Sequence, residues 1–128
     1  MTQTQSVAID RPWQEVCDFL AQPLNFNRWA SGLGNSLRLE SGVWLGEGPA
    51  GPITLRFSEP NTYGVADHWV GVAPGVEVYV PLRVVASGEG CEVMLTLFRQ
   101  PGMSDAQFQA DSDWVARDLA SLKQLLEA

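Results

Sequence analysis

The last quarter of the chain predicts one long amphipathic helix, and this feature constrains the fold more than any other. The segment Ser104-Asp-Ala-Gln107 matches a capping box, in which Ser104 and Gln107 satisfy each other's backbone amides. An apolar stripe follows at helical spacings and comprises Phe108, Val115, Leu119, Leu122 and Leu126. About 22 residues of helix extend roughly 33 Å, which is enough to cross a small sheet. We therefore expect a sheet to lie against this helix.

The middle of the chain predicts that sheet. Turn-forming glycine, proline and asparagine residues separate runs with strand-like patterns. The runs are Ser36–Glu40, Val43–Glu47, Ile53–Glu59, Tyr63–Val72, Val76–Ala86 and Cys91–Phe98. A two-residue turn at Gly88-Glu89 would pair the last two runs, placing Leu82 opposite Leu95 and Val80 opposite Leu97 on one aliphatic face. Pro81 requires an edge position or a bulge in its strand.

The first thirty residues predict a strand followed by two short helices. The strand covers residues 2–9, and Asp10 is a candidate N-cap for a helix that carries Pro12 in its first turn. This helix is expected to end near Ala21, and a second one follows between Leu24 and Ala30. The complete order is a strand, two helices, antiparallel strands and a long helix. Such an order is typical of an α+β fold with helices on one face of the sheet.

Charge and composition exclude several classes of function. The chain has 8 basic and 15 acidic residues and a formal net charge of -7, which opposes binding to nucleic acid. Without a long apolar run or an export signal, we expect no membrane insertion and a cytoplasmic location. Cys17 and Cys91 are then expected to be free thiols. No Cys and His residues have metal-ligand spacing, so we expect no metal site and no cofactor.

Four segments resemble a known family over essentially the whole chain. They are Ile9-Asp-Arg-Pro-Trp-Gln-Glu-Val16, Pro23-Leu-Asn-Phe-Asn-Arg-Trp29, Tyr63-Gly-Val-Ala-Asp-His-Trp69 and Tyr79-Val-Pro-Leu-Arg-Val84. The chain resembles the START-like, birch-pollen-allergen-like superfamily (SRPBCC), in particular a polyketide cyclase-like bacterial subgroup. The resemblance implies a single domain over residues 1–128 with a helix-grip fold. In that fold a curved antiparallel sheet of about seven strands wraps around the C-terminal helix and leaves a cavity for apolar molecules.

His68 is the only histidine and hence the natural candidate for a catalytic acid or base near neutral pH. Neighbours on a strand point to opposite faces, so Asp67 cannot orient His68 without a bulge. A three-residue turn at residues 73–75 would place His68 opposite Val80 on the inner face, whereas a four-residue turn would place Asp67 there. We expect His68 to point inward, in a functional or a structural role.

Several other side chains are candidate ligand contacts. Trp29 and Trp44 lie where the resemblance places the mouth of the cavity. Strict alternation puts Tyr79 on the outer face, and only a bulge near Pro81 would return it to the cavity. Val115 belongs to the apolar stripe of the last helix.

Asp111 falls about 50–60° from the centre of that stripe on a helical wheel, so it is expected within the stripe or at its edge. Two interpretations remain open for Asp111. Its carboxylate reaches water, where it could pair with Arg28, or it lines the cavity and binds a polar end of the ligand.

Three functions follow from this sequence. The first is a small-molecule-binding protein that holds an apolar ligand, such as a lipid, polyketide or aromatic compound, between the sheet and the last helix. The second is a polyketide cyclase or dehydratase that uses His68 and an acidic group in the same cavity. The third is a protein-interaction module, whose outer face with Tyr79, Met94 and Phe98 could also pair two copies into a homodimer.

Overall fold

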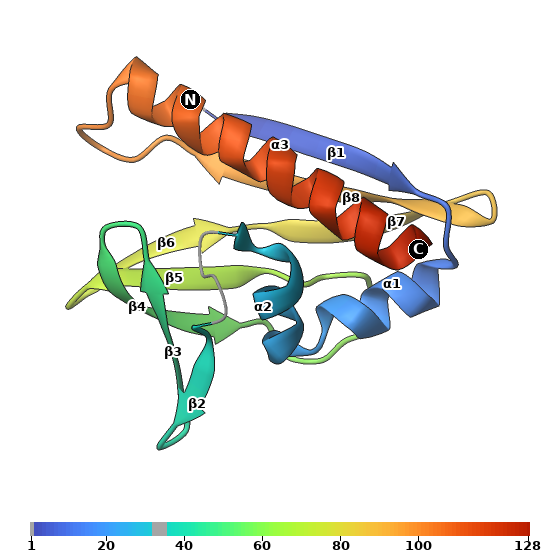
Figure 1. Cartoon of the computed structure of the whole chain (residues 1–128), viewed down its shortest axis with the longest axis horizontal. Helices are drawn as coiled ribbons and strands as arrows, with labels where there is room; N and C mark the ends of the chain where they lie inside the picture. The colour runs from blue at the N-terminus through green and yellow to red at the C-terminus, as the bar shows by residue number, and fades with distance from the viewer. Residues whose placement is uncertain (1, 32–35) are drawn as a thin grey trace.

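The computed structural model describes residues 2–31 and 36–128. Helices and strands follow one another in the expected order (Figure 1). The N-terminal part comprises β1 (Thr2–Ile9), α1 (Trp13–Leu20), the 3₁₀ helix η1 (Pro23–Asn25) and α2 (Phe26–Trp29). The remainder comprises β2 (Arg38–Glu40), β3 (Val43–Gly48), β4 (Gly51–Phe57), β5 (His68–Ala73), β6 (Val76–Val80), β7 (Leu82–Ser87), β8 (Gly90–Phe98) and α3 (Asp105–Glu127). The α+β architecture is confirmed, with eight strands in the described residues instead of about seven.

The strands of the described residues form two antiparallel sheets. One sheet has the order β1-β8-β7 and the other β2-β3-β4-β5-β6. Figure 1 shows α3 running along β1 and β8 on one face of the three-stranded sheet, with α2 between α3 and the five-stranded sheet and α1 beside the C-terminal end of α3. The capping box of α3 is confirmed, because the Ser104 side chain accepts from the Gln107 amide and the Gln107 side chain accepts from the Ser104 amide.

Pro81 marks the junction between the two sheets. The expected single strand 76–86 is broken there into β6 and β7, because proline has no amide to continue a ladder. The Pro81 carbonyl still accepts from the Thr96 amide at 3.0 Å. Beyond Pro81 the expected pairing of Leu82 with Leu95 is confirmed, whereas Val80 pairs with His68 in the other sheet and not with Leu97.

Two local expectations need correction. Helix α1 has Pro12 as its N-cap, and Asp10 instead donates its backbone amide to Glu127 at 2.7 Å. The expected strand 63–72 begins only at His68. A preceding loop is held by Asn61, whose side chain donates to the Val65 carbonyl at 2.8 Å and accepts from the Val65 amide at 3.2 Å. A local side-chain turn thus competes with the strand here.

The tightly packed core lies between the three-stranded sheet, α1 and the C-terminal half of α3. Five side chains there are less than 2% exposed: Ile9, Val16, Leu82, Val93 and Leu122. Cys17 and Cys91 are both free thiols, as expected. Within the described residues, no helix is long and apolar enough to cross a membrane.

Candidate functional site

A cluster of five rings covers the inner face of the five-stranded sheet. Phe26 and Trp29 come from α2, Trp44 from β3, Phe57 from β4 and His68 from β5. The Phe26 ring is central, with its centroid 5.1 Å from Trp29, 5.3 Å from Phe57 and 5.0 Å from His68. The Trp44 ring meets the Phe57 ring edge-on at 6.2 Å. The short helix α2 is therefore fastened to the sheet by aromatic contacts.

The hairpin between β5 and β6 determines that His68 faces this cluster. His68 pairs with Val80, as expected, although the turn differs from the expected one. Ala73 pairs with Val76, which leaves the two-residue turn Pro74-Gly75 and a bulge between Gly71 and Ala73. The extra residue in the bulge compensates for the shorter turn, so His68 remains on the inner face.

Two polar atoms in the cluster have no hydrogen-bond partner among the described residues. They are Nε1 of Trp29, whose residue is 4% exposed, and Nδ1 of His68, whose residue is 7% exposed. Buried polar groups are nearly always satisfied, because an unmade hydrogen bond costs roughly 1–3 kcal/mol. Both atoms are occluded by the side chains packed around them, so neither faces an open cavity.

Burial lowers the pKa of His68 to about 4, although a hydrogen bond to the Ala66 backbone and the charge of Asp67 act in the opposite direction. The imidazole is therefore neutral near pH 7. A neutral ring has one N–H and one lone pair, and the bond to the Ala66 backbone uses the N–H. Nδ1 of His68 is then a free hydrogen-bond acceptor and holds no proton to deliver.

The inner face next to this cluster is incompletely packed. Apolar residues that point inward from five strands and from α3 are only partly buried, namely Trp44, Ile53, Phe57, Val70, Val80, Leu97 and Val115. Equivalent inward positions in the three-stranded sheet, such as Leu82 and Val93, are 0% exposed. The core under α2 and the first part of α3 thus leaves some apolar surface accessible, although Leu55 on the same face is buried.

Tyr79 lies on the outer face, as strict alternation predicts, and not in a cavity, which would have required a bulge near Pro81. Its hydroxyl donates to Oδ2 of Asp67 at 2.5 Å, and its ring stacks between Trp69 and Phe98. Asp67 also accepts from Arg83 and from the Leu82 amide at 2.9 Å. Burial raises the pKa of Asp67, but the hydrogen bonds outweigh it and hold the pKa below its usual value. The break at Pro81 does not turn Tyr79 inward, because Tyr79 still belongs to the regular β5–β6 ladder.

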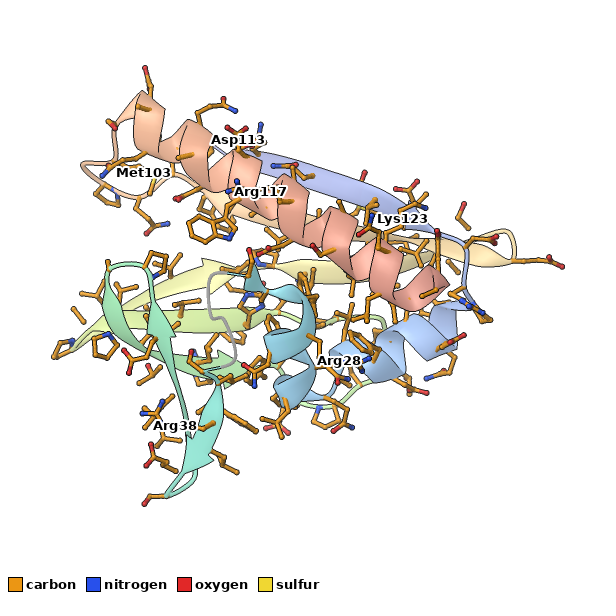
Figure 2. The ribbon with its side chains drawn as sticks, viewed as in Figure 1. Arg28, Arg38, Met103, Asp113, Arg117 and Lys123 are labelled. Carbon is orange, nitrogen blue, oxygen red and sulfur yellow. The ribbon has the colours of Figure 1, made fainter. Side chains whose placement is uncertain are left out.

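Asp111 is exposed on α3, which agrees with the interpretation that its carboxylate reaches water and not with the one that places it in the cavity wall. The adjacent Ser112 is buried instead, and its hydroxyl accepts from the Gln5 side chain at 3.0 Å. Partial desolvation still raises the pKa of Asp111. Arg28, one expected partner of Asp111, lies over the Phe19 ring at 5.3 Å. Figure 2 shows Arg28 near α2 and away from α3.

Two side chains of α3, Trp114 and Asp118, form hydrogen bonds with Ser31 just after α2, which the sequence did not indicate. Nε1 of Trp114 donates to Oγ of Ser31 at 2.6 Å, and both the amide and the hydroxyl of Ser31 donate to Oδ1 of Asp118. Arg117, labelled in Figure 2, lies over the Trp114 ring at 5.6 Å. This contact fixes α2, and with it Trp29, relative to α3.

Neither the Cys17 thiol nor the metal-ligating side chains of the described residues form a second candidate site. A pocket of about 60 Å³ between α1 and the loop before β5 includes Cys17 and Ala66 in its lining. Burial raises the pKa of Cys17 to about 11, so its thiol stays protonated and weakly nucleophilic. Within residues 2–31 and 36–128, no group of three metal-ligating side chains is placed to hold an ion.

Comparisons by sequence found neither a matching family model nor a matching curated protein. Solved structures do match the fold along nearly the whole chain. A START superfamily protein from Mycobacterium smegmatis has a TM-score of 0.74 at 7% identity, with 98% of this chain and 97% of that protein covered. The fold is the START-like, helix-grip fold.

Two further structures share the helix-grip fold. The protein XoxI from Bacillus cereus has a TM-score of 0.78 at 19% identity. The match covers 98% of this chain and 94% of the XoxI chain. The di-domain ARO/CYC protein BexL from the BE-7585A biosynthetic pathway has a TM-score of 0.75 at 19% identity. There, 99% of this chain matches 46% of BexL. Identities this low relate the folds and carry over no activity.

Proposed function

We propose that this helix-grip chain binds a small, largely apolar molecule between the inner face of β3–β6 and α3. The observation that carries the proposal is the inner apolar surface that remains partly accessible beside the aromatic cluster. Pockets for small ligands are lined mainly by apolar and aromatic side chains with a few polar groups. In this proposal Trp44, Val70, Val80 and Val115 supply the apolar lining, and His68 lies on the same face of the sheet.

The chemistry of the site favours binding over catalysis. The pKa of His68 is lowered to about 4, so the ring is neutral and only weakly basic, and the neighbouring carboxylate of Asp67 is bonded to Tyr79 and Arg83 on the outer face. The fold is also found in a START superfamily protein and in the ARO/CYC protein BexL, both named above. The two free thiols fit a reducing compartment, and we propose the cytoplasm.

The proposal is tested with N-phenyl-1-naphthylamine, a neutral dye whose fluorescence rises in apolar surroundings. We expect saturable binding to the purified chain and its loss in Val80→Trp, because the larger side chain fills the space beside His68. Val85→Trp is the matched control, since Val85 is 49% exposed on the neighbouring strand and points to the outer face. Equal dye binding by both variants would refute the proposed site.

Native mass spectrometry of the same preparation, followed by solvent extraction, identifies any molecule that co-purifies. We expect a bound small molecule in the unmodified chain and a reduced amount in Val80→Trp. Circular dichroism of both variants establishes that each is folded before the comparison is made.

A further inference from the structure

Strand β1 forms an open edge of the three-stranded sheet, whose order is β1-β8-β7. Figure 1 shows β1 at the rim of the molecule, beside α3. Five of its side chains are exposed, those of Thr2, Gln3, Thr4, Ser6 and Ala8. The backbone groups of an open edge can pair with a further strand, and proteins usually protect long edges against such pairing.

The contacts of β1 indicate which of its backbone groups lie on the open edge. In an antiparallel pair, alternate residues direct both their amide and their carbonyl to the neighbouring strand. The Ala8 carbonyl accepts from Nζ of Lys123 at 2.6 Å, so it points away from β8. The hydroxyls of the paired residues Thr4 and Thr96 hydrogen-bond at 2.8 Å, and such close side chains are typical of a pair without backbone bonds. The even-numbered residues of β1 therefore direct their amides and carbonyls to the open edge.

β1 lacks the features that protect the other edges of the described sheets. The strand Thr2–Ile9 contains no charged residue and no proline, and its register with β8 is regular. In contrast, β2 is only three residues long and includes Arg38 and Glu40, while β6 carries Glu77 and is followed by Pro81. The loop before β5 bonds to the open side of β7. Short length, charge, proline and a covering loop all oppose edge pairing, and β1 has none of them.

We propose that β1 pairs antiparallel with β1 of a second copy of this chain and joins the two three-stranded sheets into one continuous sheet. Lys123 occupies the Ala8 carbonyl, so the paired segment ends at Ser6. A two-fold axis beside Thr4 then places Thr4 opposite the partner's Thr4, and Thr2 opposite the partner's Ser6. In this register every outward amide and carbonyl between Thr2 and Ser6 gains a partner.

Charge favours a second copy as the occupant of this edge. Two chains that each carry a net charge of -7 repel each other, so a surface that pairs with itself has to be free of acidic residues. The segment Thr2–Ser6 consists only of threonine, glutamine and serine. Like charges therefore do not oppose each other along the ladder, and hydroxyl side chains can hydrogen-bond with their own kind across it. The inference goes beyond ligand binding, because β1 belongs to the other sheet.

Sedimentation equilibrium between about 10 μM and 1 mM protein tests the pairing, because a short paired segment predicts a weak dimer. We expect the mass to rise from 14.0 kDa towards twice this value. Thr4→Pro removes the outward amide from both copies, so the dissociation constant should rise at least about tenfold. Thr4→Val is the matched control, since it removes the same hydroxyl and keeps the amide, and its dimerisation should be unchanged. A monomer throughout, or equal dimerisation of the two folded variants, would overturn the inference.

Amide hydrogen exchange resolved by NMR locates the interface in the unmodified chain. The amides of Thr4 and Ser6 face outward, so they should exchange rapidly in dilute protein and at least about tenfold more slowly when the dimer dominates. The amides of Gln5 and Val7 face β8, and dimerisation should change their exchange much less. A dimer that leaves the Thr4 and Ser6 amides unprotected, such as one formed through the outer face with Tyr79, would overturn the inference. Dye binding remains a separate test of the proposed function.

Discussion

Asp67 and Asp118 show how two carboxylates in one small domain can have opposite pKa shifts. Asp67 is only 4% exposed, yet it accepts hydrogen bonds from Tyr79, Arg83 and the Leu82 amide, and these outweigh its desolvation. Burial raises the pKa of Asp118, and the hydrogen bonds from Ser31 lower it by less. The pKa of Asp118 is therefore above its usual value. The two residues therefore respond in opposite ways to removal of the negative charge.

Asp67→Asn is expected to lower the free energy of unfolding by about 2 kcal/mol at pH 7, because the amide cannot accept from both Arg83 and Tyr79 as the carboxylate does. Since Arg83 is about half exposed, solvent screens part of the ion pair and keeps the loss moderate. The lowered pKa of Asp67 means that its stabilisation is present above the usual carboxyl pKa and is lost as pH falls through the folded-state value. Urea denaturation should show the variant and the original chain converging in stability as the pH falls through the lowered folded-state pKa of Asp67.

Asp118→Asn is expected to leave the protein equally stable or more stable at pH 7. The amide oxygen can still accept from the amide and hydroxyl of Ser31, while the cost of burying a charge is removed. The raised pKa of Asp118 means that its favourable contribution is present below the usual carboxyl pKa and disappears as pH rises through the folded-state value. A marked loss of stability at pH 7 in thermal denaturation would contradict this prediction.

The orientation of a side chain could be predicted where it follows from alternation along a strand. Contacts between side chains could not be predicted where they depend on how strands are arranged in three dimensions. The inward orientation of His68 follows from counting across a hairpin, and it holds because the bulge after Gly71 offsets the shorter turn. The bonds of Asp67 to Tyr79 and Arg83 join strands whose relative positions depend on the break at Pro81, so periodicity could not reveal them. The helical wheel left two positions open for Asp111, and the structure buries its neighbour Ser112 and exposes Asp111.

At the scale of elements, long periodic segments were predicted well and broken ones were not. The capping box and apolar stripe placed α3 to within one residue at its start, since both signals are local. The strand 63–72 was predicted too long, because Asn61 bonds to the backbone of Val65 and holds a loop that carries the same residue pattern. Side-chain competition for backbone groups is not visible in hydrophobic periodicity.

Gly64 in that loop is expected to be intolerant of any side chain. Its φ is 77°, and a Cβ atom there would lie 2.3 Å from the Val84 carbonyl oxygen, beside the Trp13 ring. We expect Gly64→Ala to lower the free energy of unfolding by about 3 kcal/mol, since the clash is with backbone that cannot move independently. Gly75→Ala is the matched control: its φ is 74° but nothing lies within 4 Å of the Cβ position, so a loss of about 1 kcal/mol is expected. Equal losses in chemical denaturation would show that Gly64 is not closely packed.

At the scale of the whole molecule, the helix-grip fold divides into a closely packed half and a half with accessible apolar surface. In the three-stranded sheet, α1 and the end of α3, the side chains of Ile9, Val16 and Leu122 are at most 1% exposed, although Val7 and Leu126 are only partly buried. The inner face of β3–β6 retains accessible surface, and all three residues of β2 are exposed. The sequence predicted which side chains point inward but not this unequal packing, because packing depends on how closely α2 and α3 approach the sheet.

This division predicts two levels of amide hydrogen exchange. Amides of β8, the central strand of its sheet, and of the C-terminal half of α3 should exchange only through global unfolding, whereas those of β2, β3 and β4 should exchange faster through local opening. Saturation with N-phenyl-1-naphthylamine should slow exchange selectively in β3–β6 and α2, because a ligand stabilises the states that bind it and the local opening of this half would release it. Exchange followed by mass spectrometry at peptide resolution distinguishes the two halves. Protection confined to β1 and β8, or spread evenly over both sheets, would place the binding site elsewhere than beneath α2 and the first part of α3.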